Sequence, residues 1–366
     1  MISKRSTQHH TPDPKRVYRN LKRWFDRNAR AMPWRGETDP YRVWVSEIML
    51  VQTTGAVVTK RYPRFLRRFP TVHKLASSRI DAVMKEWEGL GYYNRARYLH
   101  RAAQIIVRDH DGIIPSDYAT IRALPGIGDY VAAAVANFCF GTRIPPVDAN
   151  VARMGARFFG IAGDVRSGKV RSQITARLQE LMTVGRGSLW TDGLIEIGAT
   201  VCMPRSPRCE SCPLAADCRA FTDGDAHALG LPAKKAQAKE VAVACGIIRR
   251  ADGRILITQR HEGGLLPLLW EFPGGKRHGN ERLAGTCRRE IKEELGISVT
   301  VGQRVMLVRH AYTHFRVRLS VFDCQYRSGT PQALGCRQFR WVRPRDLGRY
   351  AFPSADRQII AALQSS

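Results

Sequence analysis

The chain has 366 residues and a formal net charge of +27, and no run of about 18 apolar residues occurs. Length and composition therefore favour two domains and exclude a membrane-spanning segment. Lys and Arg outnumber Asp and Glu by 35 to 19 in residues 1–221 and by 24 to 13 in residues 222–366. Basic charge in both parts indicates a long polyanion as partner, most simply duplex nucleic acid, although a high-GC genome that favours arginine over lysine would also raise the arginine content.

The first part of the chain has a helical pattern. Residues 1–14 are polar and interrupted by proline, which predicts a disordered basic tail. Over residues 15–221, apolar residues recur at spacings of three and four, as expected for an all-α domain. Asp39 followed by Pro40 predicts an N-cap and a first-turn proline, and hence a helix over residues 41–51.

A short glycine turn lies between two helical segments. Gly126 and Gly128 permit a turn whose backbone N–H groups point outward at the start of a helix, an arrangement that suits a phosphate. Small residues follow at 131–135 and allow close helix packing.

Four cysteines close the helical part, with six, two and five residues between them: Cys202, Cys209, Cys212 and Cys218. Thiolates so close in sequence can converge on one soft metal centre. Disulfides are disfavoured because the chain starts without a signal peptide and its other cysteines are scattered. Structural zinc usually takes two separated ligand pairs, so the spacing favours a [4Fe-4S] cluster, with zinc as the alternative.

The pattern changes after residues 222–239, which lack periodicity and indicate a linker. Residues 240–366 predict an α/β domain. Within it, β-rich runs over 241–248 and 254–259 flank a turn signal at 251–253, and a helix follows over 282–295.

This second domain contains a complete Nudix box: Gly275, Glu281, Arg289-Glu290-Ile291, Glu293-Glu294 and Gly296-Ile297. On a helix, Glu290, Glu293 and Glu294 gather on one face, where they could hold Mg²⁺ against a diphosphate. The sequence therefore resembles the Nudix fold and gives a possible magnesium site.

The glycine turn, the small residues after it and the cysteine loop together resemble the endonuclease III superfamily of base-excision glycosylases, with its helix-hairpin-helix. Glycosylase-lyases of that superfamily place a lysine two residues after the second hairpin glycine, where it forms a Schiff base. This chain has Tyr130 there. We therefore expect a monofunctional glycosylase.

Two acidic residues are candidates for the chemistry. Glu47 has apolar neighbours, so burial would raise its pKa and leave a proton for a departing base. Asp148 could stabilise the oxocarbenium-like sugar that forms when the base leaves. The alternatives are a solvated helix residue for Glu47 and a helix N-cap for Asp148.

Residues 15–221 resemble the MutY family of adenine DNA glycosylases in the motifs at 32–35, 46–53, 87–93 and 148–150. The resemblance implies roles for a further set of residues. Gln52 and Tyr92 would wedge into the duplex near 8-oxoguanine, Tyr130 and Asn150 would hold the catalytic carboxylates and water, Glu196 would contact the flipped adenine, and Trp34 and Arg35 would belong to the DNA or lesion contacts.

Two positions depart from the family pattern. Val51 replaces a glutamine and Ala149 replaces a glycine, which bears on affinity and lesion discrimination more than on catalysis. In the second domain, Tyr312, Thr313 and His314 resemble the loop with which this family probes 8-oxoguanine. The alternative is that they are strand residues without DNA contact.

The sequence thus predicts a cytoplasmic, monomeric bacterial adenine glycosylase acting on duplex DNA that contains adenine opposite 8-oxoguanine or guanine. Two alternatives stay open. The second domain could add a Mg²⁺-dependent diphosphohydrolase activity, or the chain could be a non-catalytic lesion-binding protein.

Overall fold

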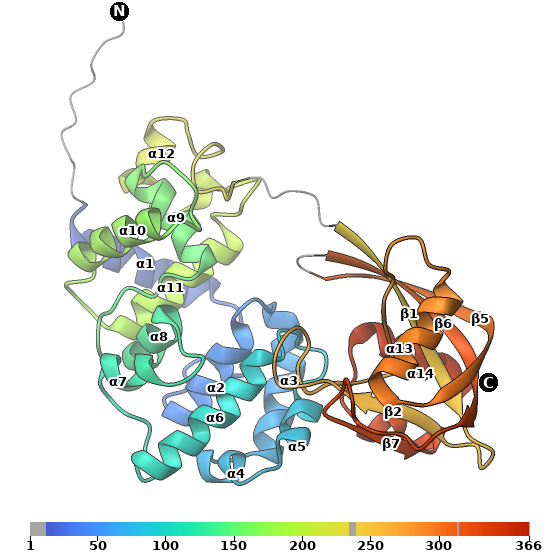
Figure 1. Ribbon diagram of the computed structural model, residues 1–366. Helices are drawn as coiled ribbons and strands as arrows, with labels where there is room; N and C mark the ends of the chain where they lie inside the picture. Colours follow the sequence, from blue (N-terminus) through green and yellow to red (C-terminus); the bar gives the residue numbers. More distant parts are fainter. Residues whose placement is uncertain (1–11, 234–238, 313–314, 366) are drawn as a thin grey trace, which may run out of the picture. The chain divides into compact units, whose positions relative to one another are not determined.

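The computed structural model describes residues 12–233, 239–312 and 315–365. The chain forms two compact units, one from residues 1–73 and 101–234 and the other from residues 74–100 and 235–366 (Figure 1). The helices α4 (Val72–Ala76) and α6 (Asn94–Asp109) contain the positions at which the chain passes from one unit to the other. None of the described helices is both long and apolar enough to cross a membrane.

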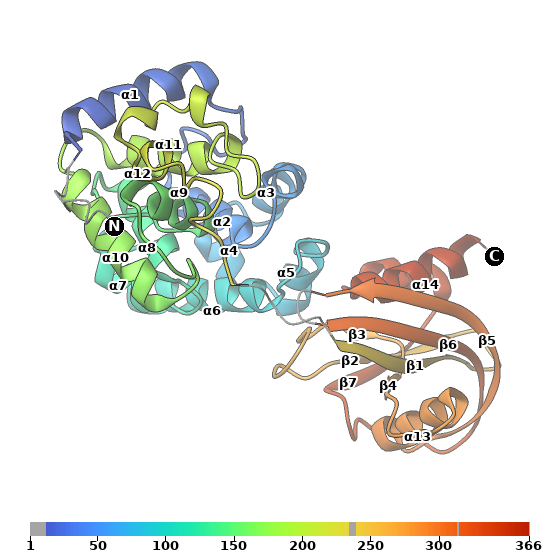
Figure 2. The ribbon, with the colours of Figure 1, turned by 90° about the horizontal axis from the view of Figure 1, so that it is seen from above.

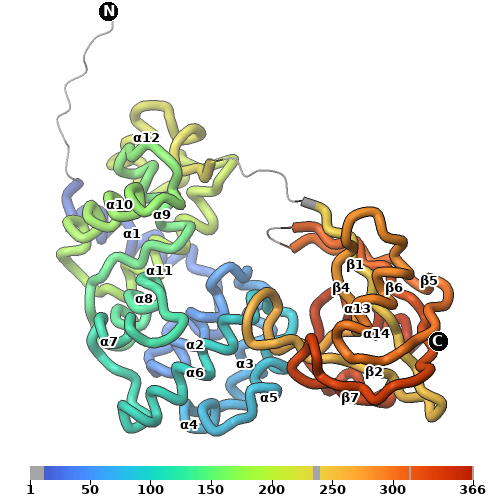
Figure 3. The backbone as a smooth tube through the Cα atoms, in the orientation of Figure 1, coloured from blue at the N-terminus to red at the C-terminus, as the bar shows by residue number. Residues whose placement is uncertain are grey.

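The first unit is helical, as predicted. Its remaining helices are α1 (Pro14–Asn28), α2 (Pro40–Leu50), α3 (Gly55–Arg68), α7 (Tyr118–Ala123), α8 (Asp129–Cys139), α9 (Ala149–Phe159), α10 (Gly168–Leu181), α11 (Gly187–Thr200) and α12 (Arg219–Thr222). Between α11 and α12 lie two short 3₁₀ helices, Cys209–Ser211 and Ala215–Asp217. Figure 3 traces this connection beside α9 and α12.

Local signals explain where α2 begins. The Asp39 carboxylate accepts a hydrogen bond from the Arg42 backbone N–H at 2.9 Å, and Pro40 occupies the first turn of α2. The predicted helix over 41–51 is therefore confirmed. Helix α2 is buried at Tyr41 and from Val43 to Met49, and α8 is buried from Val131 to Asn137. Both helices are core elements rather than amphipathic surface helices.

The second unit is built on a seven-stranded mixed sheet with the order β3-β2-β1-β6-β5, in which β4 pairs with β1 and β7 pairs with β2. The strands are β1 (Lys239–Arg249), β2 (Ile255–Gln259), β3 (Trp270–Glu271), β4 (Gly274–Lys276), β5 (Ser298–Ala311), β6 (Phe315–Ser328) and β7 (Gln338–Val342). Strands β1 and β6 are parallel, and the other pairs are antiparallel.

Two helices cover the faces of this sheet. Helix α13 (Leu283–Leu295) packs on one face, and α14 (Ser354–Ser365) packs on the other (Figure 2). A 3₁₀ helix, Pro344–Arg349, leads towards α14. The predicted β1–β2 hairpin is confirmed, with Gly253 in the left-handed region at φ 77°. The predicted helix over 282–295 is confirmed as α13.

The second unit also contains helix α5 (Ile80–Glu86). Lys85 Nζ donates to the Tyr350 carbonyl at 3.0 Å, and the Phe352 N–H donates to Glu88 Oε1 at 3.1 Å. Segment 74–100 is thus bonded to the connection between the last 3₁₀ helix and α14, although its pattern is helical. The boundaries at residues 14, 221 and 239, which rest on composition, stay predictions.

Candidate active site

Glu47 lies on the buried face of α2 and is 4% exposed. The Tyr130 hydroxyl, at the start of α8, donates a hydrogen bond to Glu47 Oε2 at 2.5 Å. Burial raises the pKa of Glu47 to about 7, and the nearby charges of Asp192 and Asp148 add to the rise, whereas the Tyr130 bond and Arg35 oppose it. A carboxyl with this pKa is partly protonated near neutrality, so it can act as a proton donor.

Asp148 is the N-cap of α9. Its Oδ1 accepts the Val151 backbone N–H at 2.7 Å, and its Oδ2 accepts from Asn150 Nδ2 at 3.0 Å. The N-cap alternative is therefore correct as a structural description. Its second oxygen is bound by the neighbouring amide, and burial raises the pKa of Asp148 while the bonds to Val151 and Asn150 lower it. The negative charges of Glu47 and Asp148 both act on Tyr130, so the three side chains are neighbours.

Arg153 connects Asn150, the partner of Asp148, to the cysteine loop. Its Nη2 donates to Asn150 Oδ1 at 3.0 Å and to the Gly198 carbonyl at 2.6 Å, and its Nε donates to the Cys202 carbonyl at 2.8 Å. One guanidinium therefore fixes both the Asn150 amide, which holds Asp148, and the backbone of Cys202.

Sequence reasoning missed Asp192, one helical turn before Glu196 on α11. Its charge raises the pKa of both Glu47 and Tyr130, so it lies at the same site. Burial raises the pKa of Asp192 itself to about 6, although the ion pair with Arg35 lowers it. The i, i+4 relation to Glu196 was the available signal, because such residues share a helix face.

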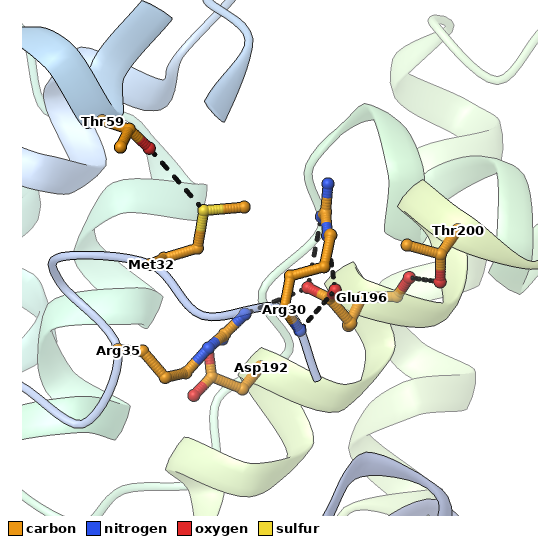
Figure 4. Close-up of polar contacts among 7 residues, drawn as sticks. All are labelled: Arg30, Met32, Arg35, Thr59, Asp192, Glu196 and Thr200. Atoms are coloured by element: carbon orange, nitrogen blue, oxygen red, sulfur yellow. Dashed lines mark hydrogen bonds and ion pairs between the residues drawn. The ribbon is translucent and has the colours of Figure 1, made fainter. Parts of the chain in front are cut away.

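Glu196 is buried, and two arginines engage it (Figure 4). Arg30 Nε donates to Glu196 Oε1 at 2.5 Å, and Arg35 Nη2 donates to Oε2 at 3.0 Å. The two arginines therefore neutralise a pair of carboxylates on α11, Glu196 and Asp192. Beside Arg35 in sequence, Trp34 packs edge-on against Tyr62 with ring centroids 5.9 Å apart.

Gln52 and Tyr92 both have left-handed backbones, at φ 59° and 45°. For residues other than glycine, such a conformation costs on the order of 1–3 kcal/mol and is common at functional sites. Gln52 is exposed, and Tyr92 is 39% exposed. The two residues belong to different units, and each by itself presents an accessible side chain on a strained turn.

The glycine turn has the predicted local form. Gly126 is left-handed at φ 76°, and Gly128 is the N-cap of α8 without a side-chain cap. Arg122 donates to the Ile127 carbonyl at 3.1 Å and pairs with Asp129 at 2.5 Å. The turn is therefore held from α7, and the first N–H groups of α8 have no capping side chain.

All four cysteines, Cys202, Cys209, Cys212 and Cys218, line one cavity beside α9. Among the described residues, no group of three or more His, Cys, Asp or Glu side chains is placed to hold a single metal ion. Thiolates that line one cavity can converge on one soft metal centre. Buried Arg157 braces the loop by donating to the Met203, Pro204 and Leu229 carbonyls.

The Nudix-box carboxylates gather around Arg289. Its guanidinium contacts Glu281 at 3.1 Å, Glu290 at 3.0 Å and Glu293 at 2.9 Å. Glu294 lies deeper, where the Gly274 N–H donates to it at 3.4 Å. Burial, with Glu271 and Glu290 nearby, raises the pKa of Glu294 to about 8.

The expected lesion-reading loop is only partly described. Tyr312 stacks on Phe315 with ring centroids 4.9 Å apart and lies edge-on to His310 at 4.5 Å. Thr313 and His314 lie outside the described residues.

Comparison with known proteins gives three family matches. Residues 45–181 match the HhH-GPD superfamily base excision DNA repair protein, residues 202–218 match the iron-sulfur binding domain of endonuclease III, and residues 244–362 match the NUDIX domain. The chain therefore has an iron-sulfur binding loop and a Nudix-fold domain.

Curated relatives extend the similarity across both units. An adenine DNA glycosylase of Buchnera aphidicola subsp. Acyrthosiphon pisum is 35% identical over 81% of this chain and 83% of the relative. The Homo sapiens adenine DNA glycosylase is 29% identical over 94% of this chain and 73% of its own length. A solved thermostable thymine-DNA glycosylase matches with a TM-score of 0.52 and 28% identity over 57% of this chain and 97% of that chain. The chain belongs to the adenine DNA glycosylases, base-excision repair enzymes that act on N-glycosyl bonds.

Proposed function

We propose that the protein removes adenine paired with 8-oxoguanine or guanine in duplex DNA and leaves the strand uncut. The contact between the Tyr130 hydroxyl and Glu47, at 2.5 Å, carries this proposal. It puts a phenol, which cannot form a Schiff base, where a lyase would have its lysine. The same contact holds a partly protonated carboxyl in place.

Glu47 is the proposed general acid. Adenine is a poor leaving group unless a ring nitrogen is protonated, and a buried carboxyl with a pKa of about 7 can supply that proton. The scissile bond is inaccessible in a stacked duplex, so the adenine has to be flipped out at a cost of roughly a few kcal/mol.

Asp148 is the proposed stabiliser of the cationic sugar. Its Oδ1 caps α9 and its Oδ2 is held by Asn150, so the carboxylate needs no reorganisation when positive charge develops. Asn150, fixed in turn by Arg153, is proposed to orient Asp148 and the attacking water.

Asp192 is proposed to contact the flipped adenine, the role that the resemblance implies for Glu196. Both oxygens of Glu196 are engaged by Arg30 and Arg35, whereas the charge of Asp192 acts on Glu47 and Tyr130. A carboxylate beside the general acid can accept a hydrogen bond from the exocyclic amine of adenine. In this proposal, Glu196 and the two arginines position Asp192.

Recognition of the opposite base is proposed for Gln52, Tyr92 and the loop at Tyr312, Thr313 and His314. The left-handed turns at Gln52 and Tyr92 support a wedge role, because strain of this kind is retained where function needs it. The stacking of Tyr312 on Phe315 supports a preformed aromatic surface.

A [4Fe-4S] cluster is proposed for the cysteine loop, held by Cys202, Cys209, Cys212 and Cys218. When bound it would supply structural cross-linking of the loop rather than a reacting group, because no cysteine belongs to the Glu47–Asp148 site. Arg153 and Arg157 then position the loop against α9.

The test is a single-turnover assay on four duplexes with one adenine opposite 8-oxoguanine, guanine, cytosine or thymine. We expect free adenine from the first two and strand breaks only after alkali. Strand cleavage without alkali would contradict the monofunctional proposal. Release from none of the four would favour the non-catalytic lesion-binding alternative.

A second candidate activity is Mg²⁺-dependent diphosphate hydrolysis in the second unit. The specific observation in its favour is the gathering of Glu281, Glu290 and Glu293 around Arg289 on α13. Normal and oxidised nucleoside triphosphates incubated with Mg²⁺ test it, and the absence of monophosphate product would leave the box as a scaffold.

A further inference from the structure

A pocket of about 260 Å³ lies entirely within the second unit, away from the Nudix-box helix. We refer to it as the arginine pocket, and its polar and aromatic lining consists of Arg79, Asp81, Trp270, Arg340, Arg349 and Tyr350. The residues come from the α5 segment, strands β3 and β7, and the end of the 3₁₀ helix before α14. None of them belongs to the proposed catalytic site.

Hydrogen bonds fix the walls of the arginine pocket. Gln259 Nε2, fully buried on β2, donates to Asp81 Oδ1 at 2.8 Å. Lys85 Nζ holds the Tyr350 carbonyl at 3.0 Å, and the Trp270 N–H donates to the Ala351 carbonyl at 2.8 Å. The pocket is therefore a preformed feature of this unit.

The lining is strongly cationic. Three guanidiniums face one carboxylate, and Asp81 already accepts the amide of Gln259. Arg79 and Arg349 have side chains that are 81% and 80% exposed, and their nearest carboxylates are at 3.7 and 3.4 Å. Arg340 makes no ion pair with the described residues. Its guanidinium lies over Trp270 at 5.4 Å and over Tyr350 at 5.9 Å.

This geometry selects an oxyanion rather than a base. Trp270 is 2% exposed and packs edge-on against Tyr350, and the Arg340 guanidinium lies over one face of each ring, so these rings offer a base little surface for stacking. Guanidinium groups bind phosphate oxygens in a bidentate manner, and aromatic stacking preorganises the Arg340 fork. Two further arginines, Arg79 and Arg349, line the same pocket with long exposed side chains that can reach adjacent phosphates.

We propose that the arginine pocket binds phosphate groups, supplied by the backbone of duplex DNA. The formal charge of +27 and the membership of a DNA-acting family favour the duplex as the source. Free nucleotides or diphosphates carry the same chemistry and are the other source. The pocket would anchor the second unit to DNA without reading its sequence, as phosphate contacts do.

The first arm of the test measures DNA affinity against salt concentration. Binding of an undamaged fluorescent duplex to the full chain is followed for wild type, Arg340→Gln and the triple variant R79Q/R340Q/R349Q. Each phosphate contact that is lost lowers the slope of log Kobs against log[salt] by about 0.9. With one contact per arginine, we expect a fall of about 0.9 for the single variant and about 2.7 for the triple variant.

Matched controls separate the site from general charge and from folding. Arg254→Gln, on the β1–β2 turn, removes an equal charge elsewhere in the unit and is expected to change the slope less than Arg340→Gln does. Arg340→Lys keeps the charge but loses the planar fork, so affinity should fall with little change in slope. Adenine release at saturating protein should be preserved in all variants, which distinguishes failure here from failure of the proposed glycosylase function.

The second arm uses calorimetry with inorganic pyrophosphate and with dATP. Pyrophosphate binding that is lost in Arg340→Gln, with an unchanged DNA slope, would support the phosphate pocket and assign it to free phosphates. If neither the DNA slope nor pyrophosphate binding depends on Arg340 more than on Arg254, the proposal is overturned.

Discussion

Glu47 in the first unit and Glu294 in the second are both buried glutamates whose pKa is raised chiefly by desolvation, to about 7 and about 8. Their surroundings differ. Glu47 accepts a phenol hydrogen bond at 2.5 Å and neighbours Asp148 and Asp192. Glu294 accepts a backbone N–H at 3.4 Å and lies near Glu271.

The difference shows that a raised pKa alone does not define the role of a buried glutamate. The side chains around the carboxyl decide which chemistry it can perform. Around Glu47, Tyr130 donates a hydrogen bond and Asp148 adds a negative charge, and these are the groups that the proposed reaction uses. In the Nudix box, Arg289 pairs with Glu281, Glu290 and Glu293, and Glu294 lies deeper beside Glu271. A similar pKa therefore occurs in two different sets of neighbours.

The comparison is tested most strongly by Glu47→Gln. The amide cannot donate the proton, so single-turnover release of adenine opposite 8-oxoguanine should fall by on the order of 10²–10⁴. Glu180→Gln, on the exposed side of α10, is the control and should keep the wild-type rate. A Glu47→Gln rate equal to that of wild type would exclude the general-acid role.

Asp148→Asn tests the second carboxylate. Asparagine caps a helix as well as aspartate does, so α9 should remain folded while the negative charge is lost. Release should fall by on the order of 10²–10³ with little change in Tm. Ser167→Asn, an equivalent cap exchange on α10, controls for the cap itself. If Asp148→Asn lowers Tm markedly as well as the rate, the carboxylate has a mainly structural role.

Tyr130→Phe tests the hydrogen bond that distinguishes Glu47 from Glu294. The active form of Glu47 is protonated, so the rate should fall as pH rises through its pKa of about 7. The Tyr130 bond lowers that pKa, and its removal should move the falling limb to higher pH. Single-turnover rates between about pH 5.5 and 9 give the limb directly. A shift to lower pH would contradict the assignment.

Glu294→Gln has the smallest expected effect and concerns stability. The native pKa of about 8 lies above the ordinary value of 4.5, so the folded state binds more protons over that window. Stability should therefore fall as pH rises from about 5 to 9, by up to a few kcal/mol. Glutamine does not titrate, so the variant should flatten this dependence in thermal unfolding.

The control for this stability effect is Glu293→Gln on the same helix. The Glu293 side chain is 57% exposed, so this variant should leave the pH dependence of unfolding unchanged. An equal pH dependence in wild type and Glu294→Gln would show that another group is responsible, Asp356 being the first to examine because burial raises its pKa to about 7.

Much of the candidate site could be predicted because its residues lie in local motifs. Tyr130 follows a glycine turn by two positions, and Asp148 and Asn150 lie at one helix start. Asp192 was missed because the resemblance was read as giving the adenine contact to Glu196, which lies on the same helix face. Its relation to Glu47 depends on the packing of α11 near α2 and α8, which no local pattern expresses.

The sequence alone determined the elements whose signals are local: α2 from Asp39 and Pro40, the β1–β2 hairpin from Asp252 and Gly253, and α13 from its box. Capping and turn chemistry act over a few residues, so they can be read without the fold. Only the tertiary structure decided the contacts across long separations. Burial of α2 against α8 sets the pKa of Glu47, and the packing of α5 with the C-terminal strands creates the arginine pocket, because both depend on which surfaces exclude water together.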